Sequence, residues 1–449
     1  MFRTIVAKKI GFPLQDYARN TDISSVYHFL KESQYWEESK IYDYRLKKLK
    51  NLVDHSYKNV PYYENLFKSI KLKPSDIHTL EDIQKIPLLT KDIARKENMN
   101  LIARGSNLKL VRKGKTGGTT GSPLIVYKDT QNRSFTWAAD RRWYDWMGIS
   151  YYDRSASIWG ARSVLSASRK QRIIADVVRF LQNSISINSF EMSPAELPNI
   201  YRKLKEFNPV IIRGYLSAIL DIARYIDKEN LTHLKPKAIS TTTESLLPHY
   251  RVYLQKVFAA PVYDQYGCGE LSAISYECSK HNGLHVNQEH MVIEILDDEH
   301  KSIMNYKGRI VGTDLDNYVM PFIRYENGDM ATMYTRKCDC GINQPLMSSI
   351  EGRSADTIEL KNGSKVHGVF ITDILYELYI LTDTVQRFQA IQYQPGQLSL
   401  TLETDKNLST SLLKELELAL HRFFEDVEIH TSSRIPNEEN GKFRYIKVI

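Results

Sequence analysis

The sequence predicts an α/β protein in which a large layered unit precedes a small α+β unit, and three observations support this class. Short β-branched stretches alternate with amphipathic helical stretches between residues 210 and 263, as in a sheet flanked by helices. The 449 residues are enough for about two to four domains. A glycine-containing turn at 350–353 precedes a segment with its own rhythm of strands and helices. We therefore expect two domains, 1–352 and 353–449.

The first hundred residues predict helices, which form a lead-in of about 1–105. Apolar residues recur at helical spacing from Tyr42 to Val53. Two shorter amphipathic stretches, Leu80–Ile86 and Lys91–Glu97, are separated by Pro87, which ends a helix.

Strands are predicted to begin at Leu108. Leu108–Arg112 and Leu124–Tyr127 bracket a loop rich in glycine and threonine. Strands and helices then alternate in the order Val210–Gly214, Leu216–Tyr225, Ala238–Ser240, His249–Phe258 and Val262–Tyr263.

The C-terminal unit is predicted to mix strands and helices. We expect strands at Thr357–Leu360, Phe388–Tyr393, Leu398–Glu403 and Val427–His430, and helices at Ile371–Leu378 and Ser411–Phe424. A segment of this size can form a compact domain.

Composition excludes several classes of protein. Apolar residues make up 42% and charged residues 25%, which excludes a disordered or low-complexity chain. No apolar stretch approaches the roughly 18 residues of a spanning helix, and the N-terminus lacks the core of a secretory signal. We therefore expect a cytoplasmic protein without a membrane span. The net charge of +8 suits anionic small molecules. The sequence has no stripe of interleaved basic and aromatic residues, so nothing in it indicates binding of nucleic acid.

The loop at 115–123 has the chemistry of an anion cradle. It holds three glycines and three threonines in nine residues, so main-chain amides and hydroxyls can point at one spot. A flexible hairpin loop is the alternative interpretation. The spacing of a Walker loop is absent.

At this point the sequence resembles a known family. The loop is similar to the phosphate-binding loop of adenylate-forming enzymes, usually Thr-Ser-Gly-Thr-Thr-Gly-Lys-Pro, although Ser122 stands where many relatives carry lysine. Nearly the whole chain resembles the branch that contains phenylacetate-CoA ligase and the CapK-type proteins. Asn59–Tyr63 and Ile86–Lys91 resemble the lead-in of that branch. The resemblance implies a large N-terminal adenylation domain and a small, mobile C-terminal domain.

The resemblance assigns nucleotide-binding roles to four motifs. Tyr263–Glu270 resembles the Tyr-Gly-x-Thr-Glu motif, Arg324–Asp329 the Arg-Tyr-x-x-Gly-Asp motif, and 352–356 the Gly-Arg-x-x-Asp hinge; 435–442 resembles the motif with the last lysine. The implied nucleotide-binding residues are Thr116, Gly117, Gly118, Thr119, Thr120, Gly121, Tyr266, Gly267, Asp329 and Arg353.

The catalytic residues implied by the resemblance are Lys442, Glu270 and Thr120. Lys442 would reach the carboxylate and α-phosphate, Glu270 would hold Mg²⁺, and Asp356 would be the hinge pivot. Without the resemblance, Tyr266 would be interpreted as a strand-end tyrosine, Asp329 as part of a turn, and Lys442 as a solvated side chain.

The implied activity is carboxylate activation in two steps. ATP and a carboxylic acid give an acyl-adenylate, and coenzyme A then takes the acyl group. The resemblance implies that this ligase serves polysaccharide or secondary metabolism. We expect the acid pocket at five residues: Trp159, Arg162, Arg213, Tyr215 and Glu244. Either arginine could bind a carboxylate or a phosphate, but an arginine is more often a surface salt-bridge partner.

Two alternatives stay open for the activity, and the branch also implies a partner. One is an AMP-forming ligase that passes the acyl group to a sugar amine or hydroxyl without coenzyme A. The other is a non-catalytic protein that keeps the fold. The branch further implies a second copy of the chain as a homodimer partner.

Four residues predict a structural zinc site. Cys278 and His285 are followed by Cys338 and Cys340 in a Cys-x-Cys-Gly turn, and a Cys₃His set completes a tetrahedron. Members of the branch carry the same pattern. His281 is the competing fourth ligand. Four cysteines in 449 residues do not form a disulfide scaffold.

Overall fold

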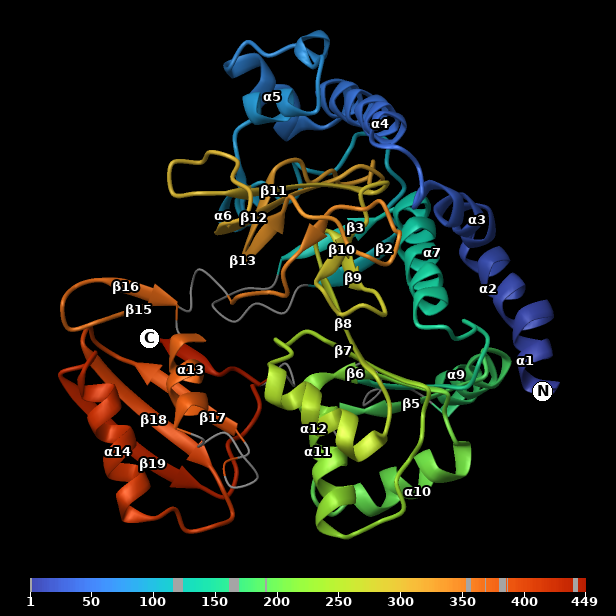
Figure 1. Cartoon of the computed structure of the whole chain (residues 1–449). Helices are drawn as coiled ribbons and strands as arrows, with labels where there is room; N and C mark the ends of the chain where they lie inside the picture. Colours follow the sequence, from blue (N-terminus) through green and yellow to red (C-terminus); the bar gives the residue numbers. More distant parts are fainter. Residues whose placement is uncertain are drawn as a thin grey trace.

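The elements fall into a helical lead-in, a large sheet with helices on both faces and a small C-terminal unit (Figure 1). The fold is taken from a computed structural model, which describes residues 2–115, 124–160, 169–189, 192–352, 357–367, 369–378, 385, 387–438 and 443–449. The predicted α/β class, with a large N-terminal unit and a small C-terminal unit, is confirmed.

The lead-in is helical, as predicted. Its elements are α1 (Phe2–Val6), the π-helical turn η1 (Ala7–Gly11), α2 (Phe12–Arg19), α3 (Ile23–Ser33), α4 (Glu38–Asn59), α5 (Pro61–Ser69), η2 (Pro74–Asp76), η3 (Glu81–Lys85) and α6 (Lys91–Lys96). Thr90 caps α6, because its hydroxyl accepts a hydrogen bond from the N–H of Ile93. The stretch at 80–86 forms a 3₁₀-helix rather than an α-helix.

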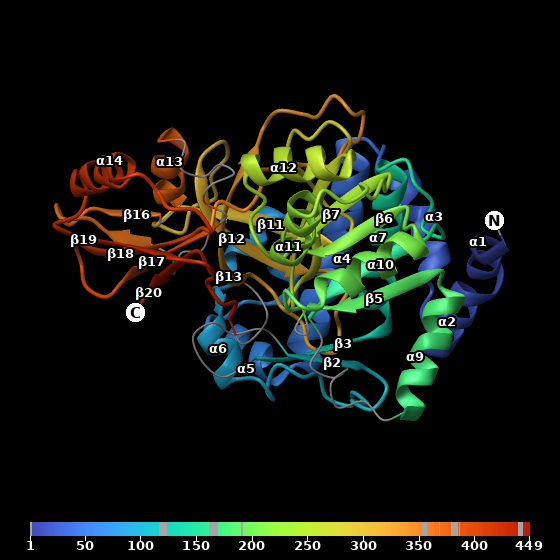
Figure 2. The same cartoon turned by 90° about the horizontal axis from the view of Figure 1, so that it is seen from below.

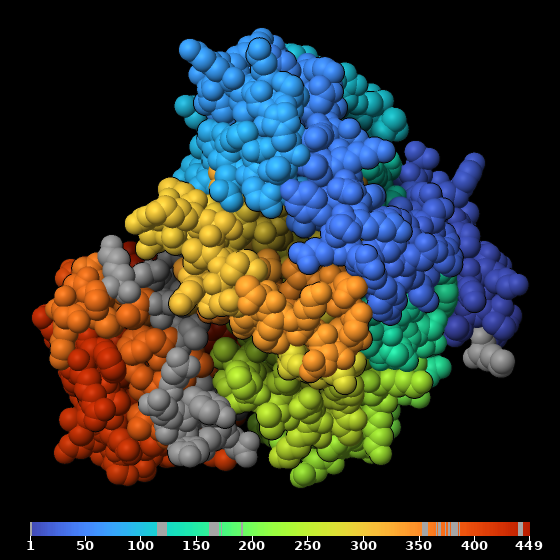
Figure 3. Space-filling model, turned by 45° about the horizontal axis from the view of Figure 1, so that its top comes forward, coloured from blue at the N-terminus to red at the C-terminus, as the bar shows by residue number. Residues whose placement is uncertain are grey.

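The lead-in shares one apolar core with the large sheet. Leu49, Val53 and Phe67 are fully buried in the same cluster as Phe322 and Tyr325, which lie far along the chain. The space-filling view shows the blue lead-in directly against the yellow strands of the sheet (Figure 3).

The hairpin that carries the glycine-threonine loop begins later than predicted. It pairs β2 (Arg112–Lys115) with β3 (Ile125–Lys128), so the predicted strand at Leu108–Arg112 is wrong. The side chain of Asn107 accepts a hydrogen bond from the N–H of Lys109 and turns the chain there. Leu110 is consequently 72% exposed instead of packed.

One half of the large sheet is parallel. Its strands are β4 (Ser155–Trp159), β5 (Ser184–Asn188), β6 (Ile211–Tyr215), β7 (Ala238–Thr242) and β8 (Val262–Cys268). The helices that accompany it are α7 (Thr130–Trp146), α9 (Arg169–Leu181), α10 (Leu197–Phe207), α11 (Leu216–Lys228) and α12 (Pro248–Phe258).

Helices bury both faces of this parallel half. Ile212 and Ile239 pack into a cluster with α10, α11 and α12, whereas Ile211 and Ala238 pack into a cluster with α3 and α7. Neighbouring residues of a strand point to opposite faces, so both clusters are filled by the same strands. Figure 2 shows the helices on both sides.

The other half of the sheet is mostly antiparallel. It contains β1 (Leu89–Thr90), β9 (Ser272–Glu277), β10 (Leu284–Val286), β11 (Met291–Leu296), β12 (Lys307–Asp314), β13 (Tyr325–Tyr334) and β14 (Leu346–Met347). Within the described ranges both halves form one 12-stranded sheet in the order β11-β12-β13-β14-β10-β9-β8-β7-β6-β4-β5, with β1 beside β13.

The C-terminal unit has its own sheet and core. Its elements are β15 (Thr357–Glu359), β16 (Lys365–His367), α13 (Val369–Glu377), β17 (Arg387–Gln392), β18 (Gln397–Glu403), α14 (Thr410–His421), β19 (Asp426–Ser432) and β20 (Ile446–Val448). Both helices pack on the sheet β19-β18-β17-β20. In the part of the chain that the structure describes, no helix combines the length and apolar content needed to cross a membrane.

Candidate functional site

The tyrosine and the aspartate that were predicted to bind the nucleoside lie in direct contact. Tyr266, near the end of β8, donates a hydrogen bond from its hydroxyl to Oδ2 of Asp329 on β13, at 2.8 Å. The side-chain amide of Asn327 donates to the same hydroxyl. Burial and the charge of Asp329 raise the pKa of Tyr266, which keeps its hydroxyl a donor. Residues 63 positions apart are thus brought to one point.

Glu270, the predicted magnesium ligand, lies at the turn between β8 and β9. Its side chain is nearly buried, and Oε1 accepts a hydrogen bond of 2.9 Å from the hydroxyl of Tyr325. Lys128, at the end of β3, donates to the hydroxyl of Ser272. Lys128 pairs with Arg112, so this bond ties the open end of the β2–β3 hairpin to the strand that follows Glu270.

The predicted acid-pocket residues lie at the carboxyl ends of three parallel strands: Trp159 ends β4, Tyr215 ends β6, and Glu244 lies two residues after β7. The rings of Trp159 and Tyr215 lie 5.1 Å apart, and Trp159 is 37% exposed. Burial, then the charge of Glu244, raises the pKa of Tyr215. In open α/β sheets ligands bind outside this edge. Position 214, next to Tyr215 at this edge, requires glycine, because a Cβ there would lie 2.1 Å from the carbonyl oxygen of Ile158.

Arg213 is placed differently from these residues. Its guanidinium lies 3.0 Å from Oδ2 of Asp140, and both side chains are largely buried. Asp140 also accepts a hydrogen bond from the hydroxyl of Tyr276. This geometry favours the alternative in which Arg213 is a salt-bridge partner.

Glu244 connects the large and small units. It accepts hydrogen bonds from the N–H and the hydroxyl of Ser217, at 2.7 and 2.9 Å, so it caps the N-terminus of α11. Its Oε1 also accepts the N–H of Phe443 at 3.2 Å. Nearby, the hydroxyl of Tyr445 donates to that of Tyr250 at 3.1 Å. Both Phe443 and Tyr445 belong to the small unit.

The chain ahead of the predicted hinge approaches both parts of the site. The N–H of Met330, next to Asp329, donates to the carbonyl of Gly352, and the hydroxyl of Ser245, next to Glu244, donates to that of Ile350. Several predicted residues lie outside the described ranges: Thr116, Gly117, Gly118, Thr119, Thr120, Gly121, Arg162, Arg353, Asp356 and Lys442.

The structure brings the four predicted zinc ligands together. One ligand atom each from Cys278, His285, Cys338 and Cys340 lies within 4.8 Å of every other. The sulfurs of Cys278 and Cys338 are 3.7 Å apart, and Nε2 of His285 is 3.3 Å from the sulfur of Cys340. Bonds of about 2.3 Å to sulfur and about 2.0 Å to nitrogen in a tetrahedron give separations close to these.

The competing residues lie elsewhere. His281 contacts Arg251 and Glu277 and is absent from the cluster of four. Burial raises the pKa of Cys268 to about 12, so this thiol stays protonated at neutral pH. Cys268 therefore lacks the thiolate that a nucleophile needs.

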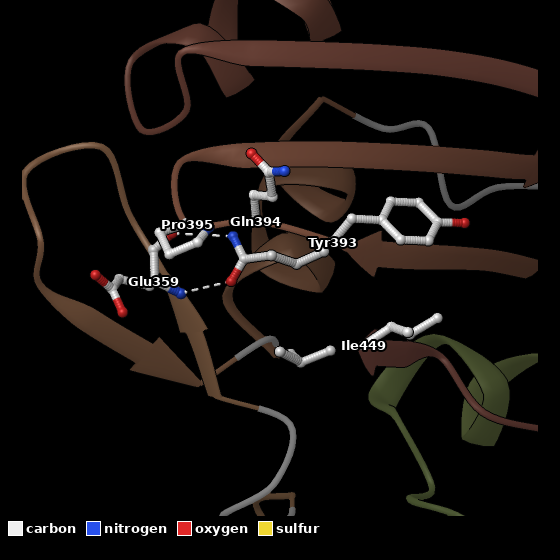
Figure 4. Close-up of a pocket in the computed structure, with 7 residues that line it drawn as sticks. Glu359, Tyr393, Gln394, Pro395 and Ile449 are labelled. Atoms are coloured by element: carbon white, nitrogen blue, oxygen red, sulfur yellow. Dashed lines mark hydrogen bonds between the residues drawn. The ribbon is translucent and has the colours of Figure 1, made fainter.

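A shallow hollow of about 290 Å³ lies on the small unit, away from these groups (Figure 4). Tyr393, Gln394 and Ile449 line it. The side-chain amide of Gln392 exchanges two hydrogen bonds with the main chain of Glu359 at its wall. These bonds fasten the β15–β16 hairpin to β17. We therefore interpret the hollow as a result of how these strands pack and not as a binding site.

Three contacting residues were not singled out from the sequence. Tyr325 and Asn327 lie inside the Arg324–Asp329 motif, so the motif could have been used to predict them. Ser217 carries no motif, since its role depends on a helix N-terminus meeting Glu244 in space.

Comparisons with known proteins agree with the resemblance. Residues 358–448 match the family model of the CapK C-terminal domain. The chain is 25% identical to protein CapK of Staphylococcus aureus over 442 residues, 93% of each chain. It is 24% identical to a phenylacetate-coenzyme A ligase of Pseudomonas putida over 374 residues, 79% of each. The predicted resemblance to this branch is confirmed.

A solved structure shows the same fold. The chain superposes on 2-hydroxyisobutyryl-CoA ligase in its postadenylation state, in complex with R3-HIB-AMP, with a TM-score of 0.76 at 17% identity, covering 93% of this chain and 91% of the other. The same ligase in its thioesterification state gives 0.63.

Proposed function

We propose that the protein is an AMP-forming ligase that activates a carboxylic acid with ATP and transfers the acyl group to coenzyme A. In the first step a carboxylate oxygen attacks the α-phosphorus of ATP, giving an acyl-adenylate and pyrophosphate. In the second step the thiol attacks the acyl carbon, and AMP leaves. The observation that carries the proposal is the direct bond between Tyr266 and Asp329, with Glu270 on the turn that directly follows the strand of Tyr266, beside the carboxyl edge of the sheet.

Each described residue has a role that its contacts support. Tyr266 provides a ring for the adenine face, with its hydroxyl end anchored by Asp329 and Asn327. Asp329 provides a carboxylate for the ribose hydroxyls. Glu270 provides a carboxylate for Mg²⁺, because carboxylate oxygens are the ligands that this hard cation prefers. Bound Mg²⁺ would supply charge compensation at the phosphates.

The residues outside the described ranges complete the proposed site. The amides and hydroxyls of 116–121 would surround the phosphates, and Arg353 would contact the nucleotide. Phe443 directly follows Lys442, so its bond to Glu244 supports an approach of Lys442 to the acid-pocket edge. A rotation about Asp356 would then remove Lys442 for the second step.

We also propose that the four-residue cluster holds a structural zinc ion. Three thiols and an imidazole form the donor set of closed structural sites, and burial lowers the pKa of His285 to about 4, which keeps the imidazole neutral. Cys278 directly follows β9, His285 is the middle residue of β10, and Cys338 and Cys340 lie in the loop between β13 and β14. Zinc there would hold these strand connections together.

The proposal is tested by pyrophosphate release from ATP over a panel of aryl, short aliphatic, hydroxy and amino acids. We expect release that depends on one class of acid, and turnover that requires coenzyme A. Release of AMP without a coenzyme A requirement would instead support transfer to a sugar amine or hydroxyl. Bound ATP with no release for any acid would contradict the ligase proposal.

Replacement of Glu244 by glutamine is expected to slow adenylate formation about tenfold. The carboxylate accepts hydrogen bonds from the N–H groups of Ser217 and Phe443, whereas the NH₂ group of glutamine is a donor and cannot accept them. Thioester formation from supplied acyl-adenylate should change less than about twofold, since that step uses the other orientation of the small unit. Glu229→Gln, at the opposite end of α11, is the matched control. Equal losses in both half-reactions would show that Glu244 acts on folding or acid binding instead.

A further inference from the structure

The surface formed by α1, η1, α2 and α9, called here the N-terminal surface, exposes an unusual number of large apolar side chains. Eight of them are between 51% and 87% exposed: Phe2, Ile5, Ile10, Leu14, Tyr17, Ile173, Ile174 and Val177. Scattered apolar residues are normal on protein surfaces, but a contiguous group marks a site of interaction.

The apolar residues of the first helices form a continuous stripe. The steps from Phe2 to Ile5, Ile10, Leu14 and Tyr17 are three, five, four and three residues. An α-helix would turn a five-residue step away from the stripe. The π-helical turn η1, which runs from Ala7 to Gly11 and so includes Ile10, absorbs one extra residue, so all five side chains keep one face.

The opposite side of these helices is held against the protein. The guanidinium of Arg3 lies 4.6 Å from the ring centre of Phe180 on α9. A Cβ on Gly11 would lie 2.0 Å from the carbonyl oxygen of Leu181, so the backbones touch there. Phe12 packs on the rings of Tyr151 and Tyr152. The stripe is therefore presented outward by a fixed support.

Positive charge accompanies the apolar side chains. The segment from α1 to α2 carries four basic residues and one acidic residue: Arg3, Lys8, Lys9 and Arg19, and Asp16. Helix α9 also carries four basic residues and one acidic residue: Arg169, Lys170, Arg172 and Arg179, and Asp176. Asp176 is itself paired with Arg179 at 2.6 Å. Lys8, Lys9 and Lys170 are exposed.

We propose that the N-terminal surface binds the face of a lipid bilayer that contains anionic lipids. Exposed apolar side chains on a helix that lies flat enter the boundary between headgroups and acyl chains, while lysines and arginines contact the lipid phosphates. No helix among the described residues is suited to span the bilayer, so the contact is at its surface. A two-fold pairing of this surface with itself would bring two positive surfaces together, which disfavours a second copy as its partner.

The position of the surface is compatible with catalysis at a membrane. Figures 1 and 2 both show α1, α2 and α9 side by side, at the end of the molecule opposite the small unit. A bilayer bound there would leave the small unit free to rotate.

The experiment is sedimentation of the full-length protein with vesicles of phosphatidylcholine and phosphatidylglycerol, and with vesicles of phosphatidylcholine alone. We expect binding to the anionic vesicles that weakens as salt is raised. The double variant Ile5→Ser/Leu14→Ser should bind about tenfold more weakly. Lys8→Gln/Lys9→Gln should bind the anionic vesicles about tenfold more weakly and with less dependence on salt.

The matched control is Val252→Ser/Leu418→Ser, which removes two residues of similar exposure from other faces and should bind as the wild type does. Circular dichroism checks that every variant is folded. Equal binding to both kinds of vesicle, or an equal loss in the control, would overturn the proposal. A dimer in size-exclusion chromatography that Ile5→Ser/Leu14→Ser converts to monomer, without vesicle binding, would assign the surface to self-association instead.

Discussion

Replacement of Lys442 by alanine is expected to reduce acyl-adenylate formation about a thousandfold. Negative charge develops on the α-phosphate oxygens as the carboxylate attacks, and a positioned ammonium stabilises that charge. The second half-reaction should keep most of its rate, because in the proposed cycle Lys442 has left the site by then. Pyrophosphate exchange with ATP measures the first step, and single turnover of supplied acyl-adenylate with coenzyme A measures the second.

Lys447→Ala is the matched control for this prediction. Lys447 lies five residues further along the same small unit and pairs with Glu438 at 2.7 Å. Its loss should leave both half-reactions near the wild-type rate. A Lys442→Ala variant with unchanged exchange, or with both steps lost equally, would contradict the proposed role.

The second large effect is expected at the cysteine cluster. Cys338→Ser should lose the bound zinc and lower the unfolding temperature on the order of 10 °C, because metal binding at a structural site contributes directly to folding. A strong chelator should lower the unfolding temperature of the wild type in the same way. Elemental analysis should find about one zinc ion per chain before chelation.

Cys268→Ser separates the zinc effect from the loss of a thiol. Cys268 lies on β8, outside the cluster of four, so its variant should retain zinc and respond to the chelator as the wild type does. Wild-type protein without zinc, or a chelator that leaves unfolding unchanged, would remove the metal from the proposal.

The sequence was most informative where structure is local. The alternation of strand and helix from residue 210 onward predicted β6, α11, β7 and α12 within a few residues. The strand at 446–448 was missed, since its three residues are defined by parallel pairing with β17 rather than by a pattern of their own. The early start of the predicted strand at 108 failed because one asparagine side chain turns the backbone.

Prediction of the site followed a similar rule. Motifs led to Tyr266, Asp329 and Glu270, but only the fold shows that the first two touch. Arg213 illustrates the opposite case. An arginine near a strand end suits an anion. The buried partner of Arg213 is Asp140, which lies 73 residues away in the sequence, and no local sequence pattern predicts that pairing. The Glu244 bond to Phe443 spans 199 residues and was equally invisible.

The shared core of the lead-in and the sheet has a consequence for synthesis on the ribosome. The hydroxyl of Tyr63 donates to the carbonyl of Pro321, 258 residues later, and β1 pairs with β13. The lead-in leaves the ribosome first, but the partners that bury its apolar residues arrive only after most of the chain has been made. The apolar residues of its helices therefore stay exposed to water until β13 has been made, and exposed apolar surface of this kind is prone to aggregation during translation.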